Sequence, residues 1–180
     1  MRFRRVRIVF LIVTTILFSG LFLWPYFVLG LAVEFEANLS SIRRLSVFRQ
    51  ERVVRLAVAK LHGGHRHAVY SMIVLSADES PWLKRDIIEQ LRMTNDVGQR
   101  IYIYVLLFNR YGEKGWLADA YSDWSGCQNR EIITPRFLLG SAIYLVDKGL
   151  AEELGAVFNF ETNSVLPVDY VKRRLGVVQK

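Results

Sequence analysis

Two adjacent carboxylates, Asp78 and Glu79, are the side chains best placed in this sequence for acid–base chemistry. They follow the apolar run 68–77 and precede a Ser-Pro pair, which is typical of a helix start. A carboxylic acid at the edge of a core can have its pKa raised by desolvation and can then act as a general base. The alternative is that both acids occupy a solvated turn, where the positive end of the dipole of the following helix favours negative charge.

The three histidines of the chain, His62, His65 and His67, fall within six residues. Imidazole nitrogens bind zinc and copper, so a histidine-based metal site is one hypothesis for this segment. The spacing is no standard metal motif, however, and histidines at the end of a helix also interact well with its dipole. We therefore expect no bound cofactor. Cys127 is the only cysteine, which excludes an internal disulfide.

Aromatic residues of the C-terminal half are candidates for a contact surface. Trp116, Tyr121 and Trp124 lie close together in the sequence, and tryptophan and tyrosine dominate the energetics of protein interfaces. Packing inside the core is the competing explanation for each of them. If they form a contact surface, these side chains bind a partner protein.

The segment 74–82, VLSADESPW, resembles the part of monofunctional peptidoglycan glycosyltransferases in which an apolar helix ends in an acid pair followed by an aromatic residue. Further similar positions are Gln99-Arg100-Ile101, Tyr111-Gly112, Ala120 and Thr134-Pro135. The resemblance implies a mostly helical domain, a lipid-linked disaccharide as substrate, and the role of base for Asp78. The acid pair is reversed relative to the family, and the stretches that line its donor site have no counterpart here. The family relationship would therefore be that of a shortened or degenerate glycosyltransferase.

A membrane anchor is expected near the N-terminus. Residues 8–33 carry no charge and form a run long enough to cross a hydrocarbon core of about 30 Å. Within that core only a helix satisfies the hydrogen bonds of its own backbone, so this run is expected to be helical. Four arginines precede this run and two glutamates follow it, so the N-terminus is expected in the cytoplasm and the C-terminal part outside it. The run is longer than the apolar part of a cleaved signal peptide. The bacterial inner membrane is the expected location, and the mitochondrial inner membrane is the alternative.

The net charge of +7 comes from the N-terminal third of the chain. Residues 38–61 are expected to form a helix that ends before a Gly-Gly pair. Its arginines either meet anionic lipid headgroups or lie on a solvated helix packed against the domain. They are Arg43, Arg44, Arg49, Arg52 and Arg55. A basic segment beside the membrane with few aromatic residues argues against nucleic acid as a partner.

We therefore divide the chain into a cytoplasmic N-terminus (1–7), a transmembrane anchor (8–33), a basic membrane-proximal helix (34–67) and an exported globular domain (68–180). Local signals predict strands at 68–77, 100–108, 116–121 and 157–160, and helices at 80–93, 134–154 and 168–175. The fold class expected is a single transmembrane helix plus one α+β exported domain. A mainly α exported domain is the alternative.

The function expected from these features is that of a single-pass, membrane-anchored cell-envelope protein. Its exported domain would bind other membrane or envelope proteins, as an accessory or assembly subunit of a membrane complex, while the anchor contacts lipid. The first alternative is the degenerate glycosyltransferase, and the second is a histidine-based metal-binding envelope protein. Whether the chain is an enzyme stays open at this point.

Overall fold

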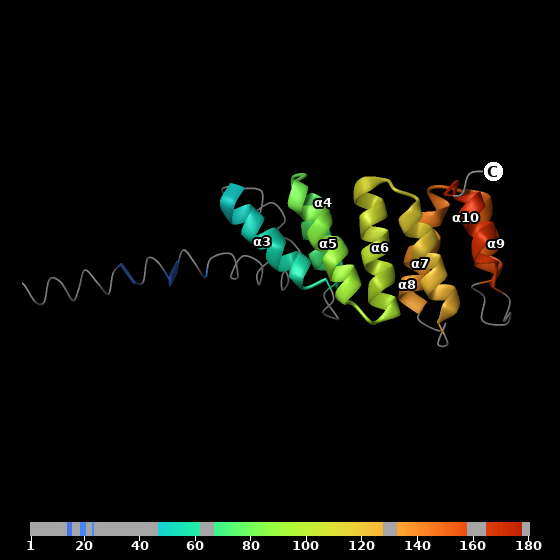
Figure 1. The fold of residues 1–180 in the computed structure, drawn as a ribbon, viewed down its shortest axis with the longest axis horizontal. Coiled ribbons are helices and arrows are strands. Elements are labelled where there is room, and N and C mark those ends of the chain that lie inside the picture. The colour runs from blue at the N-terminus through green and yellow to red at the C-terminus, as the bar shows by residue number, and fades with distance from the viewer. Residues whose placement is uncertain are drawn as a thin grey trace, which may run out of the picture.

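The computed structural model describes residues 47–61, 67–127, 133–157 and 165–177, together with five residues near the N-terminus. Between residues 47 and 177 the described part of the chain forms eight helices and no strand. They are α3 (Val47–Ala59), α4 (His67–Ser76), α5 (Pro81–Met93), α6 (Val97–Tyr111), α7 (Gly115–Gly126), α8 (Ile133–Tyr144), α9 (Lys148–Val157) and α10 (Val168–Arg174). In Figure 1 they succeed one another along the long axis, from α3 at one end to α9 and α10 at the other.

The α+β fold class was the wrong expectation for this part of the chain, and the mainly α alternative is confirmed there. The predicted strands 68–77, 100–108 and 116–121 lie in α4, α6 and α7. Tertiary packing overrides the strand preference of their β-branched and aromatic residues, because a helix that is buried on most sides must be apolar on most sides. The fourth predicted strand, 157–160, starts at the last residue of α9 and otherwise lies outside the described residues.

Helix α6 is the centre of the domain and contacts α4, α5, α7 and α8. Its start is fixed by Asp96, whose carboxylate accepts a hydrogen bond from the Gln99 N–H at 2.7 Å. Its end is fixed by Gly112, which adopts the left-handed conformation (φ 71°) and donates its N–H to the Phe108 carbonyl. The buried residues between these caps are Gly98, Ile101, Ile103, Tyr104, Val105, Leu106 and Leu107.

Helix α3 shares this core. Its buried residues are Val53, Val54, Ala57 and Val58, followed by Leu61 just after the helix. Arg55 joins α3 to α5, since its guanidinium lies 2.9 Å from the Asp86 carboxylate and 4.1 Å from the centre of the Trp82 ring. The folded domain therefore begins before the boundary expected at residue 67, and α3 packs against it as a partly solvated helix.

The C-terminal helix α10 is held by a hydrogen-bonded ion-pair cluster. The Arg174 guanidinium binds both oxygens of Asp147, at 2.9 and 3.0 Å, and one oxygen of Glu153 at 2.7 Å. The Tyr170 hydroxyl donates to the other oxygen of Glu153. Asp147 also accepts the Leu150 N–H and so begins α9. One aspartate therefore breaks the helix expected over 134–154 and anchors the end of the domain.

No helix among the described residues has the length and apolar character needed to cross a bilayer. The predicted anchor 8–33 lies almost entirely outside the described residues. Those described within it are helical, and they are Thr14, Thr15, Ser19, Gly20 and Leu23.

Replacement of Leu107 by alanine should lower the free energy of unfolding by about 2–5 kcal/mol, because it leaves a cavity beside the central helix. Thermal unfolding of the full chain, followed by circular dichroism, measures this. Leu75→Ala is the matched control: Leu75 is 41 % exposed, and its truncation should change stability by about 0.5 kcal/mol or less. Equal losses in both variants would contradict the central position of α6.

The Arg174 cluster predicts a pH dependence of stability. Hydrogen bonds from Arg174 and from the Leu150 N–H lower the pKa of the Asp147 carboxyl. Because the folded pKa is depressed, the contribution is complete above the unfolded value of about 4 and is lost as pH falls through the folded value. Asp147→Asn keeps an oxygen for the α9 N–H but removes the charge.

We expect the melting temperature of Asp147→Asn to be lower than that of the wild type at pH 7, by the equivalent of about 1 kcal/mol. Between about pH 4 and pH 2 the difference between the two proteins should shrink. A constant difference over that range would show that the carboxylate charge contributes nothing to stability.

Candidate functional site

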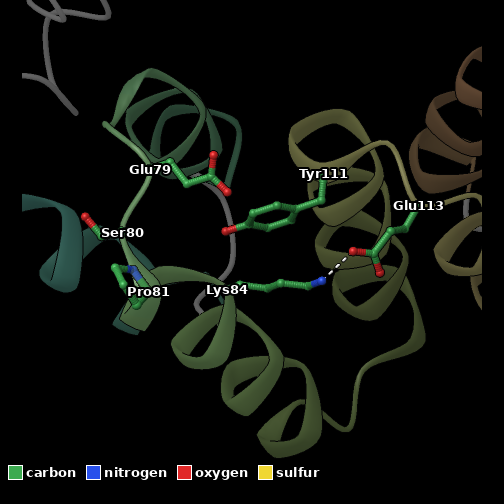
Figure 2. A pocket seen from close by; sticks show the side chains of 6 residues that line it. All are labelled: Glu79, Ser80, Pro81, Lys84, Tyr111 and Glu113. Carbon is green, nitrogen blue, oxygen red and sulfur yellow. Dashed lines mark hydrogen bonds and ion pairs between the residues drawn. The ribbon is translucent and has the colours of Figure 1, made fainter.

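An open pocket lies where the turn between α4 and α5 faces the turn between α6 and α7 (Figure 2). Its volume of about 510 Å³ is within the range of small-molecule and side-chain binding sites. The residues that line it are Glu79, Ser80, Pro81, Lys84, Tyr111 and Glu113. These residues come from two segments about thirty positions apart in the sequence.

The first wall is the start of α5. Ser80 has extended backbone angles (φ −140°, ψ 142°) and Pro81 occupies the first turn, as expected from the Ser-Pro pair. Leu83 and Ile87 are fully buried and fix the rotation of α5 about its axis. Lys84, one position after Leu83, is thereby directed into the pocket (Figure 2).

The second wall is the end of α6. The left-handed conformation of Gly112 stops the helix directly after Tyr111 and places Glu113 opposite α5. A residue with a Cβ would be strained at this backbone angle. The Glu113 carboxylate pairs with the Lys84 ammonium, which bridges the two walls (Figure 2).

Arg110 holds the two walls of the pocket together. Its guanidinium donates hydrogen bonds to the carbonyls of Val74 (2.7 Å), Leu75 (3.2 Å) and Ala77 (2.9 Å). These carbonyls belong to the C-terminal end of α4, where positive charge is favoured by the helix dipole. The turn that carries Asp78 and Glu79 is therefore fastened to α6 by one side chain.

The charges of the pocket are unevenly compensated. The Lys84 ammonium is neutralised by Glu113 and lies 5.1 Å from the centre of the Tyr111 ring. Glu79 is exposed and has no ion-pair or hydrogen-bond partner among the described residues. The Tyr111 hydroxyl is buried, and it too has no hydrogen-bond partner in the described part of the chain. The pocket thus presents the Glu79 carboxylate to an occupant, whereas the Tyr111 hydroxyl oxygen is covered.

Of the two acids predicted as catalytic, Glu79 lines the pocket, whereas Asp78 does not. Both side chains are exposed in the turn before α5. Sequence reasoning missed Lys84, Tyr111 and Glu113 as site residues. The signal that could have located the second wall is Gly112, since a glycine after an apolar run also marks the end of a helix.

The aromatic residues expected at a contact surface lie in or against the core. Tyr121 is fully buried and donates its hydroxyl hydrogen to the Leu166 carbonyl at 2.9 Å. Trp124 is 3 % exposed, and its ring lies 5.7 Å from that of Tyr121. Trp116 is half-buried against Tyr104, with 6.2 Å between the ring centres. Tyr121 and Trp124 therefore pack in the core, and partner binding by Trp116 stays a prediction.

The other predicted site residues are only partly described. Arg43, Arg44, His62 and His65 lie outside the described residues, and the side chains of Arg49 and His67 are not described. Arg52 is half-buried, and Arg55 pairs with Glu51 and Asp86. No group of three or more potential metal ligands occurs within the part of the chain that the structure describes.

A second polar cluster joins α6 to α7. The Arg100 guanidinium lies 2.6 Å from the Asp123 carboxylate and donates to the Tyr104 hydroxyl at 3.1 Å. Burial raises the pKa of the Tyr104 hydroxyl, and the negative charge of Asp123 acts in the same direction. Because its donors and acceptors satisfy one another, we interpret this cluster as a structural cross-link.

No protein-family model, no curated protein and no solved structure matches the chain. The similarity to peptidoglycan glycosyltransferases therefore remains a hypothesis that depends on the short segments quoted above.

Proposed function

We propose that this chain is a single-pass, membrane-anchored cell-envelope protein whose helical domain binds a partner protein at the pocket. It would serve as an accessory or assembly subunit of a membrane complex. The observation that carries this proposal is the uncompensated carboxylate of Glu79 at a pocket whose other charges neutralise each other. A carboxylate without an ion-pair partner in a concave site is suited to recognition of a complementary charged group.

The location is part of the proposal. The uncharged run 8–33, with arginines before it and glutamates after it, supports an anchor with the N-terminus in the cytoplasm. The helical domain then lies on the periplasmic side of a bacterial inner membrane. Location in the mitochondrial inner membrane is the alternative. In either membrane the pocket is available to other membrane or envelope proteins.

Capture from the native membrane tests this function. The full-length chain is purified in mild detergent, and proteins that stay bound are quantified by mass spectrometry. We expect a stoichiometric partner whose retention falls about tenfold in Glu79→Gln, which corresponds to a loss of about 1.4 kcal/mol. Glu89→Gln is the control, because Glu89 is an exposed glutamate of the neighbouring helix α5 that lies outside the pocket.

Two results would contradict the proposal. One is the absence of any stoichiometric partner in the membrane extract. The other is a partner that Glu79→Gln retains as well as Glu89→Gln does, since this would place the contact elsewhere on the molecule.

A second candidate function, glycosyl transfer to a lipid-linked disaccharide, is favoured by one specific observation. Two segments that carry the resemblance to peptidoglycan glycosyltransferases, 74–82 and 111–112, both contribute residues to the lining of the pocket. The helical fold of the described residues also agrees with what that resemblance implies. On this hypothesis Asp78 or Glu79 removes a proton from the attacking sugar hydroxyl.

Polymerisation of a lipid-linked disaccharide by the full chain tests this second function. If it is correct, loss of the base in Asp78→Asn or Glu79→Gln should reduce the rate about 10²–10⁴-fold, with Glu89→Gln unchanged. Failure of the wild-type chain to form any polymer would exclude the enzymatic alternative under these conditions.

A further inference from the structure

The pocket combines an exposed carboxylate with apolar surface, and the class of its occupant follows from these two properties. We infer that it receives the cationic end of a basic side chain, lysine or arginine, whose positive charge is paired with Glu79. This inference rests on the proposed function, because it identifies the chemistry by which a partner protein is recognised at the same site.

The first support is the charge of the lining. Two carboxylates and one ammonium face the pocket, and the ammonium of Lys84 is already paired with Glu113. One negative charge, that of Glu79, is left over within a chain whose net charge is +7. An incoming cation removes this excess, whereas an incoming anion must displace Glu113 from Lys84 and also approach Glu79.

The second support is the arrangement of the hydrogen-bonding groups. In Figure 2 the Tyr111 side chain lies between Glu79 and the Lys84–Glu113 pair, with its hydroxyl on the side of Glu79. That hydroxyl has no hydrogen-bond partner among the described residues. Because that oxygen is buried, an occupant reaches the Glu79 carboxylate directly and the hydroxyl only if the atoms that cover it move. An ammonium or guanidinium has several N–H donors and no acceptor, which suits it to a carboxylate.

The third support is the apolar surface beside the charge. Pro81 and the ring of Tyr111 line the same pocket. Lysine and arginine carry three or four methylenes, which pack against such surfaces while the charged end reaches a polar partner. A compact inorganic cation would leave this surface uncovered.

Titration with a small probe tests the inference. The full chain, ¹⁵N-labelled and in detergent, is titrated with n-butylammonium while backbone amide shifts are recorded by NMR. We expect saturable shifts at the pocket, with a Kd on the order of 1–10 mM, which is typical of so small a ligand. The matched probes are n-butanol, which lacks the charge, and butyrate, which reverses it. Both should bind at least tenfold more weakly.

Two variants complete the test. Glu79→Gln should weaken n-butylammonium binding at least tenfold, while Glu89→Gln leaves it unchanged. Lys84→Met removes the competing ammonium and releases Glu113, so it should strengthen binding. The gain in Lys84→Met keeps the test decisive if Glu79→Gln is destabilised.

The outcomes separate this inference from the proposed function. If butyrate binds as well as n-butylammonium, or if Lys84→Met weakens binding of the amine, the cation inference is overturned. A captured partner that depends on Glu79, without any binding of the amine, would overturn the inference and leave the function intact. Binding of the amine without any captured partner would leave the inference intact and contradict the function.

Discussion

Burial of α6 along most of its length is the constraint on which the other helices depend. A 15-residue helix with seven buried residues must be covered by neighbours, and α4, α5, α7 and α8 supply that cover. Hydrophobic burial of this kind carries no direction by itself. The polar contacts at its ends, from Arg110 to α4 and from Arg100 to α7, select one arrangement among those that would bury the same surface.

Some helix boundaries were predictable from the sequence, whereas the choice between helix and strand for the apolar runs was not. The Ser-Pro pair placed the start of α5, and residues 168–175 were expected to be helical, close to the observed α10. For α6, by contrast, the run 101–108 has no charged or amide side chain that would reveal a period of 3.6 residues, because neighbouring helices cover most of its sides. Periodicity disappears where burial is most complete.

The candidate site also divides into residues that local sequence predicts and residues that only tertiary contacts bring together. Glu79 could be selected because its position depends on a local turn. Lys84, Tyr111 and Glu113 could not be assigned to the same site, because their proximity depends on Arg110 reaching carbonyls 33–36 positions earlier in the chain. The burial of Tyr121 and Trp124 could not be predicted for a related reason. Composition cannot separate an interface tryptophan from a core tryptophan, and α7 is covered by α6, α8 and α10.

The early start of the folded domain would limit the distance between the pocket and the proposed membrane anchor. If the proposed anchor spans residues 8–33, residues 34–46 connect it to the first residue of α3, Val47. Thirteen residues span at most about 45 Å when fully extended. On this proposal the domain would stay within a thin shell beside the bilayer, where it would meet a membrane-bound ligand at an effective concentration of about 1 mM or more. Weak individual contacts can suffice for assembly in that shell, and the same contacts would be sparsely populated in dilute solution.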